Sequence, residues 1–256
     1  MGPLFILGFP RSGTTAMAKA VTRTQKFGAY AQEGHFLHLF AQGLDRIAQG
    51  KASHNSIMED EAKRRMVLQE FRALANRVYS RKGDPCDTRW IDKTPDLAQV
   101  RAIPVLNRLW PGARYIFLYR DPFSAVRSNL ALWPNVVEGR EGDVAKRWAQ
   151  CHRVFRTHRA LLSGRCAEIY QPDMLSGPGK VAEALGEALD LGPGQIKAVA
   201  QELGRDQAVN RPRGDAGAKY DAVALSAAAL EAVEAEVRDE ADRWPRLKGT
   251  RMEIGQ

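Results

Sequence analysis

The segment from Gly8 to Thr15 reads Gly-Phe-Pro-Arg-Ser-Gly-Thr-Thr and has the residue types of a phosphate-binding loop. Backbone N–H groups at a helix N-terminus, together with the helix dipole, stabilise a bound anion. In nucleotide triphosphatases, Lys and then Ser or Thr follow the second Gly of such a loop, to bind the phosphates and magnesium. Here Thr14 follows Gly13, and the cation is Arg11 inside the loop. The pattern predicts a phosphate-bearing donor that is bound without the usual lysine and magnesium pair.

Further segments carry side chains suited to the same chemistry. Lys93 lies in Trp-Ile-Asp-Lys-Thr-Pro, Arg120 lies in Tyr-Arg-Asp-Pro, and Ser128 follows about two helical turns later. Arginine and hydroxyl side chains can donate hydrogen bonds to phosphate oxygens.

Apolar runs that end at turn signals predict the strands that must position these residues. The predicted strands are Leu4 to Gly8, Thr88 to Ile91, Ala113 to Tyr119 and Ala167 to Tyr170. In parallel α/β sheets, ligands bind outside the carboxyl ends of the strands. We therefore expect Arg11 and Arg120 to project into the same crevice.

Apolar periodicity and capping signals predict the helices. They begin at Thr14 and Pro122 and cover Glu33 to Gln49, Glu59 to Arg81, Val144 to Leu162 and Leu230 to Trp244. Another helix should start after Thr94, its expected N-cap, and be interrupted at Pro104. The stretch from Gly204 to Ala222 is polar, basic and rich in Gly and Pro, and we expect a mobile surface loop there.

Composition limits the class of protein. With 256 residues, 44% of them hydrophobic, the chain is predicted to form a single α/β domain over residues 1–256. The sequence shows no apolar run of about 20 residues and no leader pattern, which predicts a soluble cytoplasmic protein without a membrane span. The cysteines lack metal-ligand spacing and an even count, so neither zinc nor a disulfide framework is expected; they are Cys86, Cys151 and Cys166.

The net charge of +8 favours anionic partners such as nucleotides. Nucleic acid is not the expected partner, because the Lys and Arg residues are spread along the chain and no motif that reads DNA or RNA is present.

Taken together, the segment from Phe5 to Thr15, the Tyr-Arg-Asp-Pro motif and Ser128 resemble the sulfotransferases that use 3′-phosphoadenosine 5′-phosphosulfate (PAPS). The first motif is similar to their 5′-phosphosulfate loop and the second to their 3′-phosphate site. The segment from Trp90 to Pro95 and the last helix also fit, so the resemblance extends over nearly the whole chain. It implies a P-loop-like, three-layer α/β/α fold with a central parallel sheet. It also implies in-line transfer of a sulfuryl group from PAPS to an acceptor hydroxyl or amine, without a metal.

The resemblance implies a set of donor-binding residues. Arg11 would lie near the bridging oxygen, where leaving-group charge grows, and Arg120 and Ser128 would bind the 3′-phosphate. Later elements of the family's donor site resemble the surroundings of Tyr170 and Lys219. The full set is Arg11, Ser12, Gly13, Thr14, Thr15, Arg120, Ser128, Tyr170 and Lys219.

The acceptor needs a base, and Glu33 is the candidate, since the tyrosylprotein-type and many bacterial sulfotransferases have a glutamate at this place. A carboxylate in a partly desolvated cleft can have its pKa raised toward neutrality. His35 is the alternative, because the cytosolic phenol and steroid branch uses a histidine. Glu33 could instead be a first-turn carboxylate that interacts with the helix dipole.

Lys93 matches a lysine that related sulfotransferases place near the transferring group. With Arg11, it could stabilise charge in the transition state. Alternatively, Lys93 only forms a surface ion pair with Asp92 or Asp96.

Arg11 stands where the cytosolic phenol and steroid enzymes have Lys, so the chain is closer to the tyrosylprotein, carbohydrate and bacterial branches, and a bacterial cytoplasmic enzyme fits best. The residues do not distinguish small-molecule, carbohydrate, lipid and peptide acceptors, nor do they indicate an oligomeric state. Two other functions stay open. A P-loop nucleotide kinase would need Lys after Gly13 and a magnesium-binding Asp. A non-catalytic nucleotide or nucleic-acid binding protein is compatible with the charge.

Overall fold

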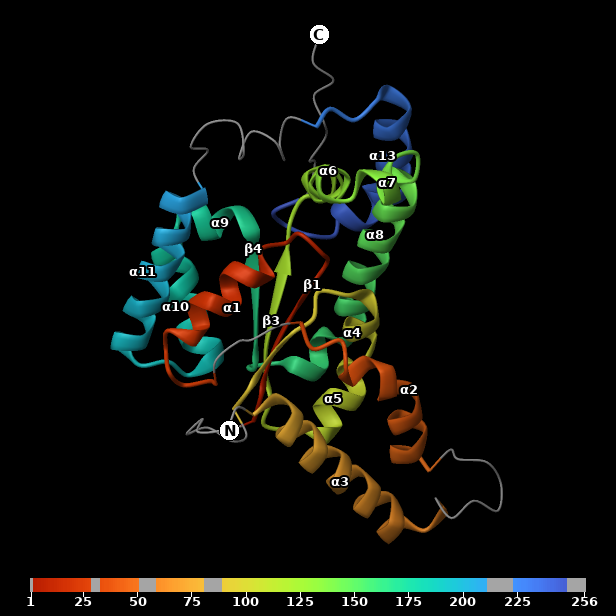
Figure 1. Ribbon diagram of the computed structural model, residues 1–256, viewed down its shortest axis with the longest axis vertical. Helices are drawn as coiled ribbons and strands as arrows, with labels where there is room; N and C mark the ends of the chain where they lie inside the picture. The colour runs from red at the N-terminus through yellow and green to blue at the C-terminus, as the bar shows by residue number, and fades with distance from the viewer. Residues whose placement is uncertain (1, 29–32, 51–58, 81–88, 211–222, 248–256) are drawn as a thin grey trace.

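The centre of the fold is a sheet of four parallel strands in the order β2-β1-β3-β4. The computed structural model describes residues 2–28, 33–50, 59–80, 89–210 and 223–247, with the backbone alone for 206–210. The strands are β1 (Leu4–Gly8), β2 (Ile91–Lys93), β3 (Arg114–Tyr119) and β4 (Cys166–Tyr170). Because all four run in the same direction, their carboxyl ends meet at one edge of the sheet (Figure 1).

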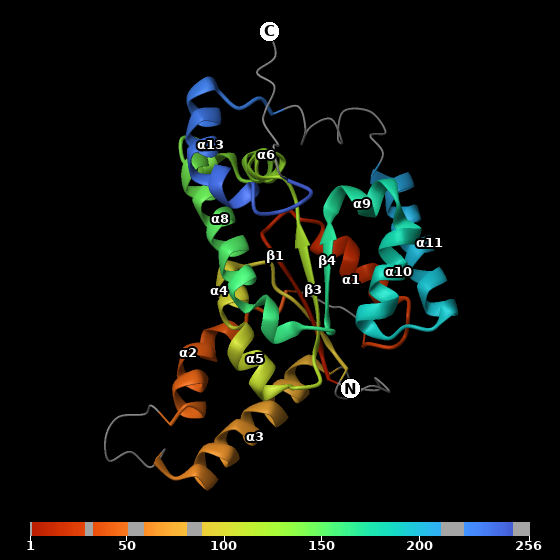
Figure 2. The ribbon, with the colours of Figure 1, turned by 180° about the vertical axis from the view of Figure 1, so that it is seen from behind.

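Helices cover both faces of this sheet (Figures 1 and 2). One face packs against α1 (Thr14–Thr22), α10 (Pro178–Leu189) and α11 (Pro193–Asn210) through a core that includes Ile6, Ile116 and Ile169. The other packs against α4 (Leu97–Arg101), α5 (Ile103–Leu109), α8 (Glu141–His158) and α13 (Ala227–Ala241) through Phe5, Leu7 and Phe117. Successive residues of β1 point to opposite faces, which explains why all of its residues are buried. The predicted three-layer α/β/α fold with a central parallel sheet is confirmed.

The remaining elements lie around the edges of these layers. They are α2 (Leu37–Ala48), α3 (Glu61–Tyr79), α6 (Pro122–Leu132), α7 (Pro134–Val137), the 3₁₀ turn η2 (Arg159–Leu162) and α9 (Gln171–Ser176). Asp121 caps α6, as predicted, by accepting a hydrogen bond from Ser124 N at 2.8 Å. Among the described residues, none of the helices has the length and apolar character needed to cross a membrane.

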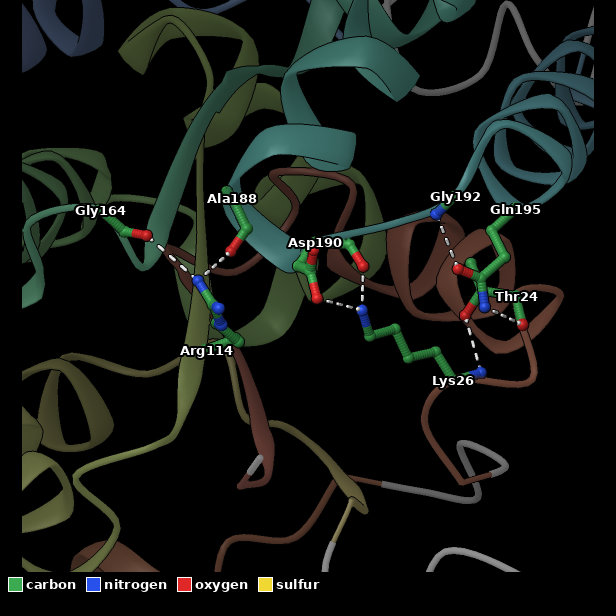
Figure 3. Close-up of polar contacts among 8 residues, drawn as sticks. All are labelled: Thr24, Lys26, Arg114, Gly164, Ala188, Asp190, Gly192 and Gln195. Atoms are coloured by element: carbon green, nitrogen blue, oxygen red, sulfur yellow. Dashed lines mark hydrogen bonds and ion pairs between the residues drawn. The ribbon is translucent and has the colours of Figure 1, made fainter.

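Polar contacts fix the α10–α11 pair to the end of α1 and to β3 (Figure 3). Lys26 Nζ donates to Asp190 Oδ2 at 3.1 Å, and Gln195 Nε2 donates to Thr24 O at 2.9 Å. Arg114 donates to the carbonyl oxygen of Ala188 at 2.9 Å. These contacts hold α1, and therefore the loop that precedes it, in a fixed position relative to the sheet.

The prediction of a loop from Gly204 to Ala222 is wrong for its first seven residues, because α11 continues to Asn210. Val199 and Leu203 are buried in the core beside α1, and this packing extends the helix through Gly204 despite the low helix propensity of glycine. The rest of the expected loop, residues 211–222, lies outside the described residues.

Two predicted boundaries on either side of Lys93 were also wrong. The strand predicted from Thr88 to Ile91 is observed at Ile91–Lys93, where it pairs with β1. Thr88 itself is outside the described residues. The N-cap of α4 is Asp96, whose Oδ1 accepts from Ala98 N at 2.7 Å, and not Thr94. The interruption near Pro104 is confirmed, since α4 ends at Arg101 and a separate helix, α5, begins at Ile103, next to Pro104.

Candidate active site

The loop between β1 and α1 requires glycine at both ends. At Gly8 (φ 150°), a Cβ atom would lie 2.4 Å from Leu118 O of the neighbouring strand. Gly13 is the N-cap of α1 with φ 85°, and the intervening Arg11 also has a positive φ of 72°. Glycine adopts such angles without steric cost, whereas arginine does so rarely. The chain therefore turns sharply at the carboxyl end of β1 and presents the first amides of α1.

The N-terminus of α1 has no acidic residue in its first turn and no side-chain cap. Ser12 is fully buried, and its hydroxyl has no hydrogen-bond partner among the described residues. Thr14 is buried and Thr15 is exposed. A buried polar group without a partner is costly, so the Ser12 hydroxyl fits a site whose ligand supplies acceptor oxygens. The residues present suit a phosphate or sulfate group.

Two segments distant in sequence converge on this loop. Arg11 Nε donates to Ser128 Oγ of α6 at 3.0 Å, across 117 residues of sequence. Arg120, directly after β3, donates from its guanidinium group to Arg11 O at 3.4 Å. Its own carbonyl oxygen accepts from Trp148 Nε1 at 3.1 Å, which fixes its backbone against α8. The expected convergence of Arg11 and Arg120 at one sheet edge is confirmed, and Ser128 joins them.

Tyr170, at the end of β4, lies at the same edge. Its ring centroid is 5.4 Å from that of Tyr119, and the guanidinium carbon of Arg246 lies 5.6 Å from it on the ring face. Burial raises the pKa of Tyr170, and Asp121 raises it further. The sequence did not predict the helix that follows, α9. This helix packs against the loop, since a Cβ atom at Gly13 would lie 3.0 Å from the Gln171 side chain. Lys219 lies outside the described residues.

Glu33 is placed beside Lys93 and His35, before α2. Lys93 Nζ donates to Glu33 Oε1, and His35 Nε2 lies 2.8 Å from Glu33 Oε2. Lys93 is buried at the end of β2, whereas 39% of the Glu33 side chain is exposed. Because α2 begins only at Leu37, Glu33 is not a first-turn residue. The alternative of a surface pair between Lys93 and Asp92 or Asp96 is also wrong, since Lys93 binds Glu33.

The expected rise in the pKa of Glu33 is wrong as well. Burial raises this pKa, but the hydrogen bonds and positive charges of Lys93 and His35 outweigh burial and lower it. Glu33 is therefore a carboxylate at neutral pH. Each carboxylate oxygen can accept more than one hydrogen bond, so either oxygen can still accept a hydrogen bond from an incoming group.

Asp92 is a site residue that sequence reasoning missed. It is almost completely buried, and it accepts from Thr94 Oγ1 at 2.7 Å and from Gln99 Nε2 at 2.6 Å. Burial raises its pKa to about 6, against the opposing effects of the Thr94 hydrogen bond and the charges of His35 and Lys93. The place of Asp92 within a strand could have identified it from the sequence. Strands of a parallel sheet are buried on both faces, so a carboxylate within one needs hydrogen-bond partners.

Asp92→Asn is expected to gain stability relative to the wild type as the pH rises. Unfolded Asp92 loses its proton near pH 3.8, whereas in the folded protein the proton stays to about pH 6. Between these values the unfolded state binds fewer protons, so rising pH destabilises the wild type, by about 3 kcal/mol in total. Asparagine at position 92 has no proton to lose in this pH range. The Gln99 side chain can rotate so that its amide oxygen accepts a hydrogen bond from the new amide group. Urea unfolding of both proteins at about pH 4.5 and 7.5 measures the difference.

The matched control is Asp143→Asn, at a carboxylate whose side chain is 66% exposed. Its stability difference from the wild type should stay nearly constant over the same pH range. A constant difference for Asp92→Asn would contradict the raised pKa.

Within the part of the chain that the structure describes, no three His, Cys, Asp or Glu side chains form a group able to hold a metal ion. The site instead combines an uncapped helix N-terminus with Arg11 and Arg120, and the Glu33–Lys93 pair lies at the end of β2, the strand that neighbours β1. Such an arrangement can bind a multiply charged anion and accept a proton from a second molecule.

Comparison with known proteins gives one family. The model described as "Sulfotransferase family" matches residues 3–192. No curated protein matches the chain in sequence.

Two solved structures resemble the fold. The sulfotransferase STF9 from Mycobacterium avium is 16% identical, with a TM-score of 0.53 over 95% of this chain and 76% of that one. The sulfotransferase domain of the Synechococcus PCC 7002 olefin synthase is 19% identical, with a TM-score of 0.55 over 91% and 94%. At these identities the likeness shows the fold alone.

Proposed function

The chain belongs to the sulfotransferase family, and on this premise we propose that it transfers a sulfuryl group from PAPS to an acceptor hydroxyl or amine. The observation that carries the proposal is the hydrogen bond from Arg11 to Ser128 at the N-terminus of α1. It joins the candidate residues for the two phosphate-bearing ends of PAPS, which distinguish this donor from ATP. We also propose that the chain acts as one domain, in a bacterial cytoplasm.

The protein's main task in this reaction is to position the donor and stabilise the charge that grows on the leaving phosphate. In PAPS the sulfuryl group is already activated by its phosphosulfate anhydride. The amides of residues 12–15 and the Ser12 hydroxyl would hold the 5′-phosphosulfate, and Arg11 would stabilise the leaving-group charge. Ser128 accepts from Arg11, so its own hydroxyl proton is available to donate to a 3′-phosphate beside Arg120.

Glu33 would take the proton of the acceptor as it attacks. Its low pKa keeps it ionised, and Lys93 holds one of its oxygens in place. Lys93 has three N–H donors, so the same ammonium group can also stabilise charge in the transition state. No metal has a role in this proposal.

An observation at Asp121 disfavours the P-loop kinase alternative. Such an enzyme needs an Asp after a strand to hold magnesium. The first residue after β3, where the magnesium-binding Asp would be expected, is Arg120. The next residue, Asp121, caps α6 with one of its carboxylate oxygens.

Thermal unfolding with added nucleotides tests the donor site. We expect 3′,5′-ADP to raise the melting temperature, by a stabilisation of about 2.7 kcal/mol at a concentration 100 times Kd, and ATP with magnesium to have less effect. Ser128→Ala should weaken 3′,5′-ADP binding about tenfold, because it removes a hydrogen bond to a charged group. Ser124→Ala, one turn earlier on the same helix, is the matched control and should bind normally.

Greater stabilisation by ATP with magnesium would favour a kinase, and preferential binding of oligonucleotide would favour a nucleic-acid binding protein. Either result would overturn the proposed donor. If 3′,5′-ADP stabilises the protein as expected, labelled PAPS and a panel of hydroxyl and amine acceptors would identify the second substrate.

A further inference from the structure

The Thr94 hydroxyl connects the end of β2 to the segment that carries Glu33. It donates to Asp92 Oδ1 at 2.7 Å and accepts from the backbone N–H of His35 at 3.2 Å. Thr94 is completely buried. The hydrogen bond to His35 spans 59 residues of sequence and ties the backbone two residues from Glu33 to the end of a core strand.

The backbone at this point adopts a conformation that needs support. His35 has a φ of 44°, in the left-handed region, which costs about 1 kcal/mol or more for a residue with a side chain. At the adjacent Gly34, a Cβ atom would lie 2.1 Å from the Tyr79 hydroxyl and 2.7 Å from Asp92 Oδ1. The backbone at Gly34 and His35 therefore packs closely against Asp92 and Tyr79, and the hydrogen bond from His35 N–H to Thr94 helps to hold it there.

Asp92 fixes the direction of the Thr94 hydroxyl group. Its second oxygen accepts from Gln99 Nε2 at 2.6 Å, and Tyr79 stacks on Trp90 with ring centroids 4.4 Å apart. The Tyr79 hydroxyl lies close enough to affect Asp92 electrostatically, but not in the geometry of a full hydrogen bond. Because the Thr94 hydroxyl donates its hydrogen bond to Asp92, the lone pairs of Thr94 Oγ1 point to the His35 N–H.

We propose that Thr94, oriented by Asp92, is a positioning residue that sets the direction of the Glu33 carboxylate toward Lys93 and the acceptor. The inference rests on the proposed function, in which Glu33 is the base. Neither Thr94 nor Asp92 touches the transferred group in this proposal. Both act through the backbone of residues 33–35.

Thr94→Val removes the hydroxyl and keeps the shape of the side chain. We expect it to lower kcat about 30-fold, because a small displacement of a catalytic group has a large effect on rate. The KM for PAPS should stay nearly unchanged, since the Arg11–Ser128 contact is intact. Thr94→Ser keeps the hydroxyl and should restore kcat to within about threefold of the wild type.

Two measurements separate positioning from a general loss of structure. In a double-mutant cycle, Thr94→Val should cause little further loss of kcat when Glu33 is already Gln, because both changes act on the same group. By NMR, the His35 amide should exchange slowly with solvent in the wild type and in Thr94→Ser, and faster in Thr94→Val. The amide measurement does not depend on activity.

Fast exchange of the His35 amide in the wild type would overturn the inference even if Thr94→Val failed to fold. An equal loss of kcat from Thr94→Val with and without Glu33 would overturn it too. The proposed function fails by a different result, namely no stabilisation by 3′,5′-ADP. Full activity in Glu33→Gln would overturn only the assignment of Glu33 as the base. If the His35 amide still exchanged slowly in that case, and did so only with the Thr94 hydroxyl present, Thr94 would hold the backbone at His35 in place but would have no role in catalysis.

Discussion

Glu33→Gln should lower kcat by about 10³-fold and leave 3′,5′-ADP binding within about twofold, because general base catalysis contributes rates of this order. Glutamine keeps the length of the side chain and an oxygen for the Lys93 hydrogen bond, but it cannot take a proton. The Arg11–Ser128 contact does not involve Glu33. The change therefore affects the chemical step and not the donor site.

Single-turnover kinetics with saturating PAPS measure this step directly. Glu202→Gln is the matched control, because Glu202 also accepts from a cation, Arg23 Nε at 2.9 Å, but belongs to α11. It should retain wild-type kcat. If Glu33→Gln keeps full turnover and His35→Asn loses it, the base is His35, the alternative that the sequence left open.

Lys93→Met is expected to lower kcat by about 10²- to 10³-fold, since it removes a preorganised positive charge from the site. It should also change the pH dependence. Burial raises the pKa of Glu33, and the hydrogen bond and charge of Lys93 are the main opposing effects. Without Lys93 the pKa of Glu33 rises, so protonation should begin to inactivate the variant at a higher pH than the wild type.

The measurement is kcat/KM between about pH 5 and pH 8, which reports the pKa of the base in the free enzyme. The wild type should be nearly flat on the acidic side, and Lys93→Met should lose activity as the pH falls. Lys26→Met is the matched control: Lys26 is also a mostly buried lysine, and it pairs with Asp190 far from β2. An unshifted profile with normal kcat in Lys93→Met would show that Lys93 has no role beyond packing.

Local signals were sufficient for the elements that border the proposed donor site. An apolar run that ends in Gly8 predicted β1, and Asp121 followed by Pro122 predicted the start of α6. These patterns depend on residues close in sequence, so tertiary packing did not change them. The N-cap of α4 shows the opposite case. Thr94 and Asp96 both suit that position, and Asp96 takes it because the Thr94 hydroxyl is engaged by Asp92 and His35.

The pKa of Glu33 also depends on distant contacts. A partly desolvated carboxylate predicted a raised pKa, but the pKa is lowered by Lys93, which lies 60 residues away in sequence. The residues next to Glu33 in the sequence show neither its ion pair with Lys93 nor the direction in which its pKa shifts. In the same way, α11 extends beyond Gly204 because its apolar side chains pack beside α1.

The sequence by itself determined the family resemblance, the candidate anion-binding loop and the parallel sheet that carries it, because strand and helix periodicity and the glycine positions of a turn are local properties. Only the tertiary structure decided the charge state of Glu33 and the burial of Asp92, and only it assigned Thr94 to tether the Glu33 segment. These depend on which groups meet across the sheet edge and on how much water is excluded there, and both arise only when the chain has folded.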